Sequence, residues 1–91
     1  MVKYKLYDLN NNFLYETQSK KIMKEHTGFV ESHNSRWCVN QGILHRIDGP
    51  AFEYYDGKQE IYYYINGEQI RCYSDEQFKL LIDMMKLKGL I

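Results

Sequence analysis

The fold is decided by residues 51–72, which read AFEYYDGKQEIYYYINGEQIRC. Two turn dipeptides, Asp56-Gly57 and Asn66-Gly67, divide this stretch into three runs rich in aromatic and β-branched residues. Asp-Gly and Asn-Gly favour tight hairpin turns, because their residues tolerate positive φ. One strand pattern follows another with no helical pattern between them, so the sequence predicts an antiparallel β-meander.

Upstream of this stretch, residues 1–18 predict an N-terminal hairpin. Val2, Tyr4 and Leu6 alternate with other side chains, residues 10–12 are three asparagines, and residues 13–17 return as the partner strand. Residues 19–25 are short and polar, and predict a loop or a single helical turn.

Two further strands are predicted between this hairpin and the deciding stretch. Residues 29–32 (FVES) and 36–39 (RWCV) each contain aromatic and β-branched residues, and a turn-forming His-Asn-Ser segment separates them. Asp48-Gly49-Pro50 then interrupts the chain, because proline cannot donate a ladder hydrogen bond.

The last segment changes to a helical period. Ser74 with Gln77 three residues later forms a capping-box pattern, so we expect a helix over residues 74–88. One apolar stripe at helical spacing would cover the sheet, and consists of Phe78, Leu81, Ile82 and Met85. A second apolar face, made of Leu80, Met84 and Leu87, predicts a homodimer through this helix; the alternative is that the N-terminal hairpin covers it.

The predicted fold class is therefore mainly β (α+β), an antiparallel meander of hairpin repeats closed by a C-terminal helix. Residues 1–91 form a single domain, with the N-terminal hairpin at 1–18, the repeats at 27–73 and the helix at 74–88. Sliding the chain against itself by 25 residues aligns Trp37 with Tyr62, Gly42 with Gly67 and Arg46 with Arg71.

One run within this region also carries a resemblance. Residues 44–51, LHRIDGPA, followed by Asp56-Gly57 and by the YYING of residues 63–67, resemble a β-hairpin repeat of small bacteriophage and large-virus proteins, related in style to MORN repeats. The chain departs from the repeat at residues 26–28 and 68–71. The resemblance implies the fold, a binding or scaffold role and a phage-like origin, and it implies no enzymatic activity.

Composition restricts the classes of partner. Basic and acidic residues number 12 each, although residues 1–47 carry seven basic and four acidic side chains and residues 48–91 carry five and eight. No overall field attracts the chain to nucleic acid or to a membrane. We expect a cytoplasmic protein, in the host cell if phage-encoded, because no apolar run reaches signal-peptide length or the ~20 residues of a membrane span.

No group of residues has the spacing of a catalytic or metal site. His26, His33, Cys38 and His45 are separated by gaps that match no tight ligand pair. Cys38 lies in a predicted strand among apolar neighbours, which favours an inert buried thiol, and Cys72 is the only other cysteine. We therefore expect no enzyme activity, no metal and no cofactor.

The candidate binding residues are arginines and tyrosines, since these are the usual hot-spot types at interfaces. If Tyr63 packs inward, Tyr62 and Tyr64 face outward, forming either a cross-strand ladder or a contact platform. Arg46 has a structural interpretation too, stacking on a ring such as Tyr63 or bonding the turn around Asp48. The candidate set is Arg46, Tyr54, Tyr62, Tyr64 and Arg71.

The sequence thus predicts a non-enzymatic module that binds a host protein, as a phage-encoded modulator or inhibitor of a host enzyme or defence system. The alternative is a nucleic-acid or nucleotide binder in which exposed tyrosines stack on bases. The phosphate contacts would then come from four basic residues, Lys20, Lys21, Lys24 and Arg36.

Overall fold

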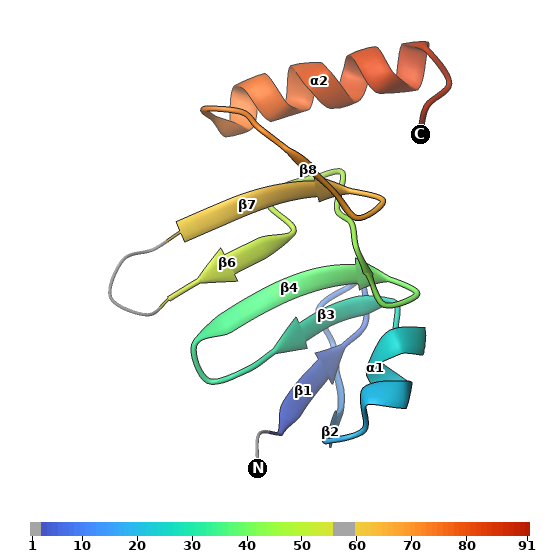
Figure 1. Cartoon of the computed structure of the whole chain (residues 1–91), viewed down its shortest axis with the longest axis vertical. Coiled ribbons are helices and arrows are strands. Elements are labelled where there is room, and N and C mark those ends of the chain that lie inside the picture. Colours follow the sequence, from blue (N-terminus) through green and yellow to red (C-terminus); the bar gives the residue numbers. More distant parts are fainter. Residues whose placement is uncertain (1–2, 56–59) are drawn as a thin grey trace.

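The computed structural model describes residues 3–55 and 60–91, so the predicted Asp56-Gly57 turn lies outside the described residues. Within them the chain is mainly antiparallel β-sheet with a C-terminal helix, as the sequence predicts (Figure 1). The elements in chain order are β1 (Tyr4–Tyr7), β2 (Phe13–Thr17), α1 (Lys20–Glu25), β3 (Gly28–Glu31), β4 (Ser35–Asn40), β5 (Ile43–Leu44), β6 (Phe52–Tyr54), β7 (Glu60–Ile65), β8 (Glu68–Ile70) and α2 (Asp75–Leu87).

The strands pair in the order β2-β1-β3-β4-β6-β7-β8, with β5 attached to β4. The hairpin of β1 and β2 therefore forms one edge of the sheet, and β8 forms the other. Of the two interpretations of residues 19–25, the helical turn is the one observed, because Ser19 accepts a hydrogen bond from the backbone N–H of Ile22 and caps α1.

The 25-residue correspondence is present in the strand pattern. β4 and β7 are six residues long and begin 25 positions apart. Each is followed by a two-residue turn with positive φ at both positions, 49° and 77° at Gln41-Gly42 and 50° and 83° at Asn66-Gly67. These values are typical of a type I′ hairpin turn, whose twist matches that of the flanking strands.

α2 packs on β7 and β8 at the C-terminal end of the sheet (Figure 1). Ser74 accepts a hydrogen bond from the Gln77 N–H at 3.1 Å, and the Gln77 side chain accepts one from the Tyr73 N–H at 2.7 Å. This arrangement differs from a strict capping box, in which that second bond would come from residue 74. Three of the four residues of the predicted inner stripe pack on the sheet, with Phe78 and Ile82 buried and Met85 against them. Leu81 is half-buried and lies outside this cluster.

The two faces of the sheet carry separate cores. Tyr63 and Ile65 of β7 pack with α2 on one face, which we call the α2 face. On the opposite face, Leu6, Val30 and Val39 form a second core with Met23 of α1. Because side chains alternate along a strand, Tyr62 and Tyr64 lie on the face opposite to Tyr63.

Candidate functional site

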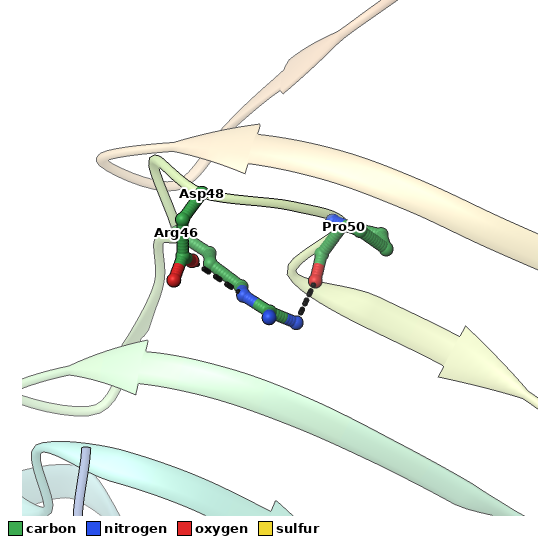
Figure 2. Close-up of polar contacts among 3 residues, drawn as sticks. All are labelled: Arg46, Asp48 and Pro50. Atoms are coloured by element: carbon green, nitrogen blue, oxygen red, sulfur yellow. Dashed lines mark hydrogen bonds and ion pairs between the residues drawn. The ribbon is translucent and has the colours of Figure 1, made fainter. Parts of the chain in front are cut away.

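The Arg46 side chain bonds two other residues of the LHRIDGPA run, Asp48 and Pro50, as Figure 2 shows. Its Nε donates to Asp48 Oδ1 at 2.7 Å, and its Nη1 donates to the Pro50 carbonyl oxygen at 3.1 Å. Gly49 lies directly against the guanidinium, since a Cβ there would stand 3.2 Å from Arg46 Cζ. The predicted bonding of Arg46 to the turn around Asp48 is therefore confirmed.

Arg46 also lies over an aromatic ring, but this ring is Phe29 and not Tyr63, the example named from the sequence. The guanidinium carbon lies 5.2 Å from the centroid of Phe29, not over Tyr63. Tyr63 is buried instead against Phe78 of α2, with their ring centroids 4.4 Å apart. The tyrosine could not serve both α2 and the arginine, because the helix occupies the space above it.

Leu44 and His45 hold the Asn66-Gly67 turn that follows β7. The Leu44 carbonyl accepts from the Gly67 N–H at 2.7 Å, and His45 Nδ1 accepts from the Asn66 N–H at 3.0 Å. The Gln41-Gly42 turn that follows β4 is held in the same way. There the His26 carbonyl accepts from Gly42 N–H at 2.9 Å, and Thr27 Oγ1 accepts from Gln41 N–H at 3.0 Å.

The candidate tyrosines belong to a row of ring contacts that crosses the sheet. Centroids are 5.9 Å apart for Tyr4 and Trp37, 5.6 Å for Trp37 and Phe52, 5.4 Å for Phe52 and Tyr54, and 6.4 Å for Phe52 and Tyr62. Trp37, Phe52 and Tyr62 are successive cross-strand partners in β4, β6 and β7. We call these five residues the aromatic ladder, and their side of the sheet the ladder face.

The aromatic ladder is only half-buried. Tyr54 is 38% exposed, and the other four rings are intermediate in exposure. Tyr62 donates its hydroxyl to Glu60 at 2.7 Å, and this bond raises the pKa of the phenol above its usual range. Tyr64 follows Tyr62 on the same face of β7 and is also half-buried.

A cavity of about 300 Å³ adjoins the Tyr4 and Trp37 end of the ladder. Lys20 and Lys24 of α1 line it together with those two rings. Neither lysine takes part in an ion pair with any residue in the ranges 3–55 and 60–91. Lys21 does not line this cavity, so the helix presents two of its three lysines to the ladder.

The other candidate residues lie elsewhere. Arg36 belongs to the α2 face, with its guanidinium carbon 4.5 Å from the Phe29 centroid, so the alternative nucleic-acid set is divided between the two faces. Arg46 lies on that same face over Phe29. Arg71 is exposed beyond the end of β8. The five predicted binding residues therefore do not form one site, and only the tyrosines share a face.

Three members of the aromatic ladder are not among the binding residues predicted from the sequence, namely Tyr4, Trp37 and Phe52. Each lies in a predicted strand, and the period-two pattern places each on one face or the other. The missing information was the cross-strand register, since a shift by one residue would move a ring to the opposite face.

The two cysteines are free, and neither lies in an activating environment. Cys38 is 3% exposed, and burial raises the pKa of its thiol. Burial also raises the pKa of Cys72, and the nearby Asp75 adds to this effect. In the described part of the chain, no three His, Cys, Asp or Glu side chains are grouped as metal ligands would be.

A pair of adjoining hollows, of about 400 and 470 Å³, lies on the α2 face beside Phe29 and Cys38. Arg46 lines both hollows, but its guanidinium already bonds Asp48 and Pro50. These contacts give Arg46 a structural role in that face.

Comparison of the chain with protein-family models, curated proteins and solved structures gives no match. Neither helix in residues 3–55 and 60–91 has the length and hydropathy needed to cross a membrane.

Proposed function

We propose that this chain is a non-enzymatic protein-binding module whose contact surface is the aromatic ladder. Under this proposal it is a phage-encoded modulator or inhibitor of a host enzyme or defence system, as the resemblance of the LHRIDGPA run implies. The observation that supports binding is the half-buried row of five rings on one side of the sheet. Tyrosine and tryptophan are the residues most enriched among interface hot spots.

Pre-organisation of the rings favours this role. Each ring contacts another ring of the ladder, across strands for Tyr4, Trp37, Phe52 and Tyr62 and within β6 for Tyr54. Little side-chain entropy therefore remains to be lost when a partner docks. Tyr4 and Trp37 also pack against the Leu6, Val30 and Val39 core, which lies on the same face of the sheet. A ladder that serves only to hold the strands together would contribute to stability and not to binding.

The test separates these two roles by substitution. Tyr54→Ala and Tyr62→Ala are compared with Tyr73→Ala, a matched control because Tyr73 is 99% exposed and precedes α2. Affinity capture from host cytoplasm identifies a partner, and titration of the purified partner measures Kd. We expect at least a tenfold loss of affinity, about 1.4 kcal/mol, for the ladder variants and no loss for the control.

Two outcomes would contradict the proposal. One is equal affinity of all three variants for the purified partner. The other is loss of affinity that follows only from unfolding, measured as a parallel drop in Tm for the ladder variants.

A second candidate function is the binding of single-stranded nucleic acid. It is favoured by the cavity that places Lys20 and Lys24 beside the Tyr4 and Trp37 rings, since stacking platforms combine rings with a basic groove. Two phosphate contacts would give a log–log salt slope of about −1.4. Lys20→Gln with Lys24→Gln should weaken oligonucleotide binding, whereas Lys21→Gln should not. Binding that is insensitive to salt and to these lysines excludes this candidate.

A further inference from the structure

The outer face of α2 carries three large apolar side chains in water. Leu80 is 64% exposed, Met84 is 52% exposed and Leu87 is 88% exposed. Phe78 and Ile82, on the inner face of the same helix, are 1% and 3% exposed. An apolar stripe of this kind on a helix that already has a packed side is typical of an interaction surface.

The N-terminal hairpin does not cover this stripe. β1 and β2 form the edge of the sheet opposite to β7 and β8, on which α2 packs. Figure 1 shows the same separation, with α2 at one end of the molecule and the hairpin of β1 and β2 at the other. The intramolecular alternative for Leu80, Met84 and Leu87 is therefore wrong, because sheet order keeps the two elements apart.

The charges beside the stripe indicate which partner fits it. Glu76, Lys79, Asp83 and Lys86 are all exposed and follow one flank of the helix with alternating sign. At about 100° per residue they lie within one sector beside Leu80, Met84 and Leu87. In an antiparallel pair of identical helices this flank faces its own copy, whereas in a parallel pair it faces the opposite flank.

Antiparallel pairing gives this flank a complementary register. If the two-fold axis passes midway between Lys79 and Asp83, each lysine meets the aspartate of the other copy. The same axis places Glu76 opposite Lys86, so all four pairs across the contact have opposite charge. The opposed helix dipoles also favour this orientation.

We propose that the chain forms a two-fold dimer in which α2 of one copy packs antiparallel against α2 of a second copy. In this register Leu80 and Met84 lie on either side of the two-fold axis and form the apolar seam, and Leu87 lies at its end, opposite residue 75 of the second copy. The alternating flank sets the orientation. A second copy is favoured over an unrelated protein because the helix is complementary in charge to itself.

This dimer goes beyond the proposed function and leaves the ladder free. α2 packs on Tyr63, and the ladder includes Tyr62 on the opposite side of the same strand. The dimer would therefore carry two ladders, each available to a partner, and a target with two copies of the contact surface would bind with avidity.

Sedimentation of the full chain tests the dimer first. We expect the parent to dimerise at chain concentrations up to about 100 µM, because an interface made by one face of a single 13-residue helix is small, and small interfaces bind weakly. A Leu80→Glu/Met84→Glu variant should be a monomer with an unchanged circular dichroism spectrum. A parent that stays monomeric over that range overturns the proposal, and so does a dimer that survives in the variant, because pairing would then use another surface such as the exposed β2 edge.

A charge cycle tests the antiparallel orientation and avoids substitutions in the apolar seam. Lys79→Glu and Asp83→Lys should each raise the dimer Kd about five- to tenfold, because each places like charges together twice across the two-fold axis. The double variant Lys79→Glu/Asp83→Lys should return Kd to within about twofold of the parent.

Lys5→Glu is the matched charge reversal on β1, distant from α2, and should leave Kd unchanged. Since residues 79 and 83 are also neighbours on one helix, the Tm of each dilute monomer is measured to remove effects within α2. A double variant that remains as weak as the single variants overturns the antiparallel register.

Discussion

Replacing Gly67 by alanine tests the hairpin turn that joins β7 to β8. Gly67 has φ +83°, a conformation that costs an alanine about 1–2 kcal/mol. An added Cβ would also stand 3.0 Å from the γ-methyl carbon of Ile43, which is a side chain that can move by a few tenths of an ångström. We expect the free energy of unfolding to fall by about 1–2 kcal/mol, or roughly 4–16 °C in Tm for a chain of this length.

Two other glycines, Gly42 and Gly89, have nearly the same φ as Gly67 but leave different amounts of space for an added Cβ. Gly42, in the equivalent turn, has φ +77°, but an added Cβ would stand 2.3 Å from the carbonyl oxygen of Lys24. The backbone at the end of α1 would have to move, so Gly42→Ala should cost about 2–4 kcal/mol. Gly89 has φ +72° with no heavy atom within 4 Å of the added Cβ, so Gly89→Ala carries only the backbone cost.

Urea and thermal unfolding of the three variants measure the series. The expected order of destabilisation is Gly42→Ala first, then Gly67→Ala, then Gly89→Ala, with the m-value unchanged. If Gly67→Ala has the same Tm as the parent, residue 67 does not need a positive φ and the proposed turn after β7 is wrong. If Gly42→Ala and Gly67→Ala lower the free energy of unfolding equally, the close contact between Lys24 of α1 and the Gln41-Gly42 turn is wrong.

Three further predictions follow from the chemistry of the described residues. Cys38→Ser and Cys72→Ser should each leave binding intact, because neither thiol lies in an activating environment; loss of affinity in a folded single variant contradicts this. Arg46→Lys should lower stability by about 1–2 kcal/mol in urea unfolding, since a lysine cannot bond Asp48 and the Pro50 carbonyl together. Burial raises the pKa of the Cys38 thiol, so the folded state keeps this proton to a higher pH than the unfolded state does. The free energy of unfolding should therefore fall as pH rises above about 8.5, the ordinary pKa of a cysteine, and Cys38→Ala should make this fall smaller.

Local chemistry made the turns and the C-terminal helix predictable. The Asn66-Gly67 pair specifies a tight turn by its tolerance of positive φ, whatever the strands around it do. Ser74 with Gln77 specifies a helix start in the same local way, and the inner stripe of α2 follows from a fixed helical period. These features depend on residues within a few positions of one another, which a single sequence contains in full.

The ladder and the partner of Arg46 depend on distant pairings, and the sequence does not contain them. Tyr4 and Trp37 are ladder neighbours although they are far apart in the chain and β3 lies between their strands. Period-two alternation tells which side chains share a face within one strand, but it does not give the register between strands. Arg46 lies over Phe29 and not over Tyr63, because β3, which carries Phe29, and β5, which precedes Arg46, both pair with β4.

β7 connects the two proposed surfaces, and its alternation keeps them independent. Tyr62 belongs to the ladder, and Tyr63 supports α2 through Phe78 and donates its hydroxyl to Asp75 at the start of that helix. Substitution of Tyr62 should therefore weaken partner binding without changing dimerisation. Substitution of Tyr63 should displace α2 and weaken the dimer before it affects the ladder. Because neighbouring residues of β7 face opposite sides of the sheet, the two proposed contact surfaces can be tested independently by substitutions in this one strand.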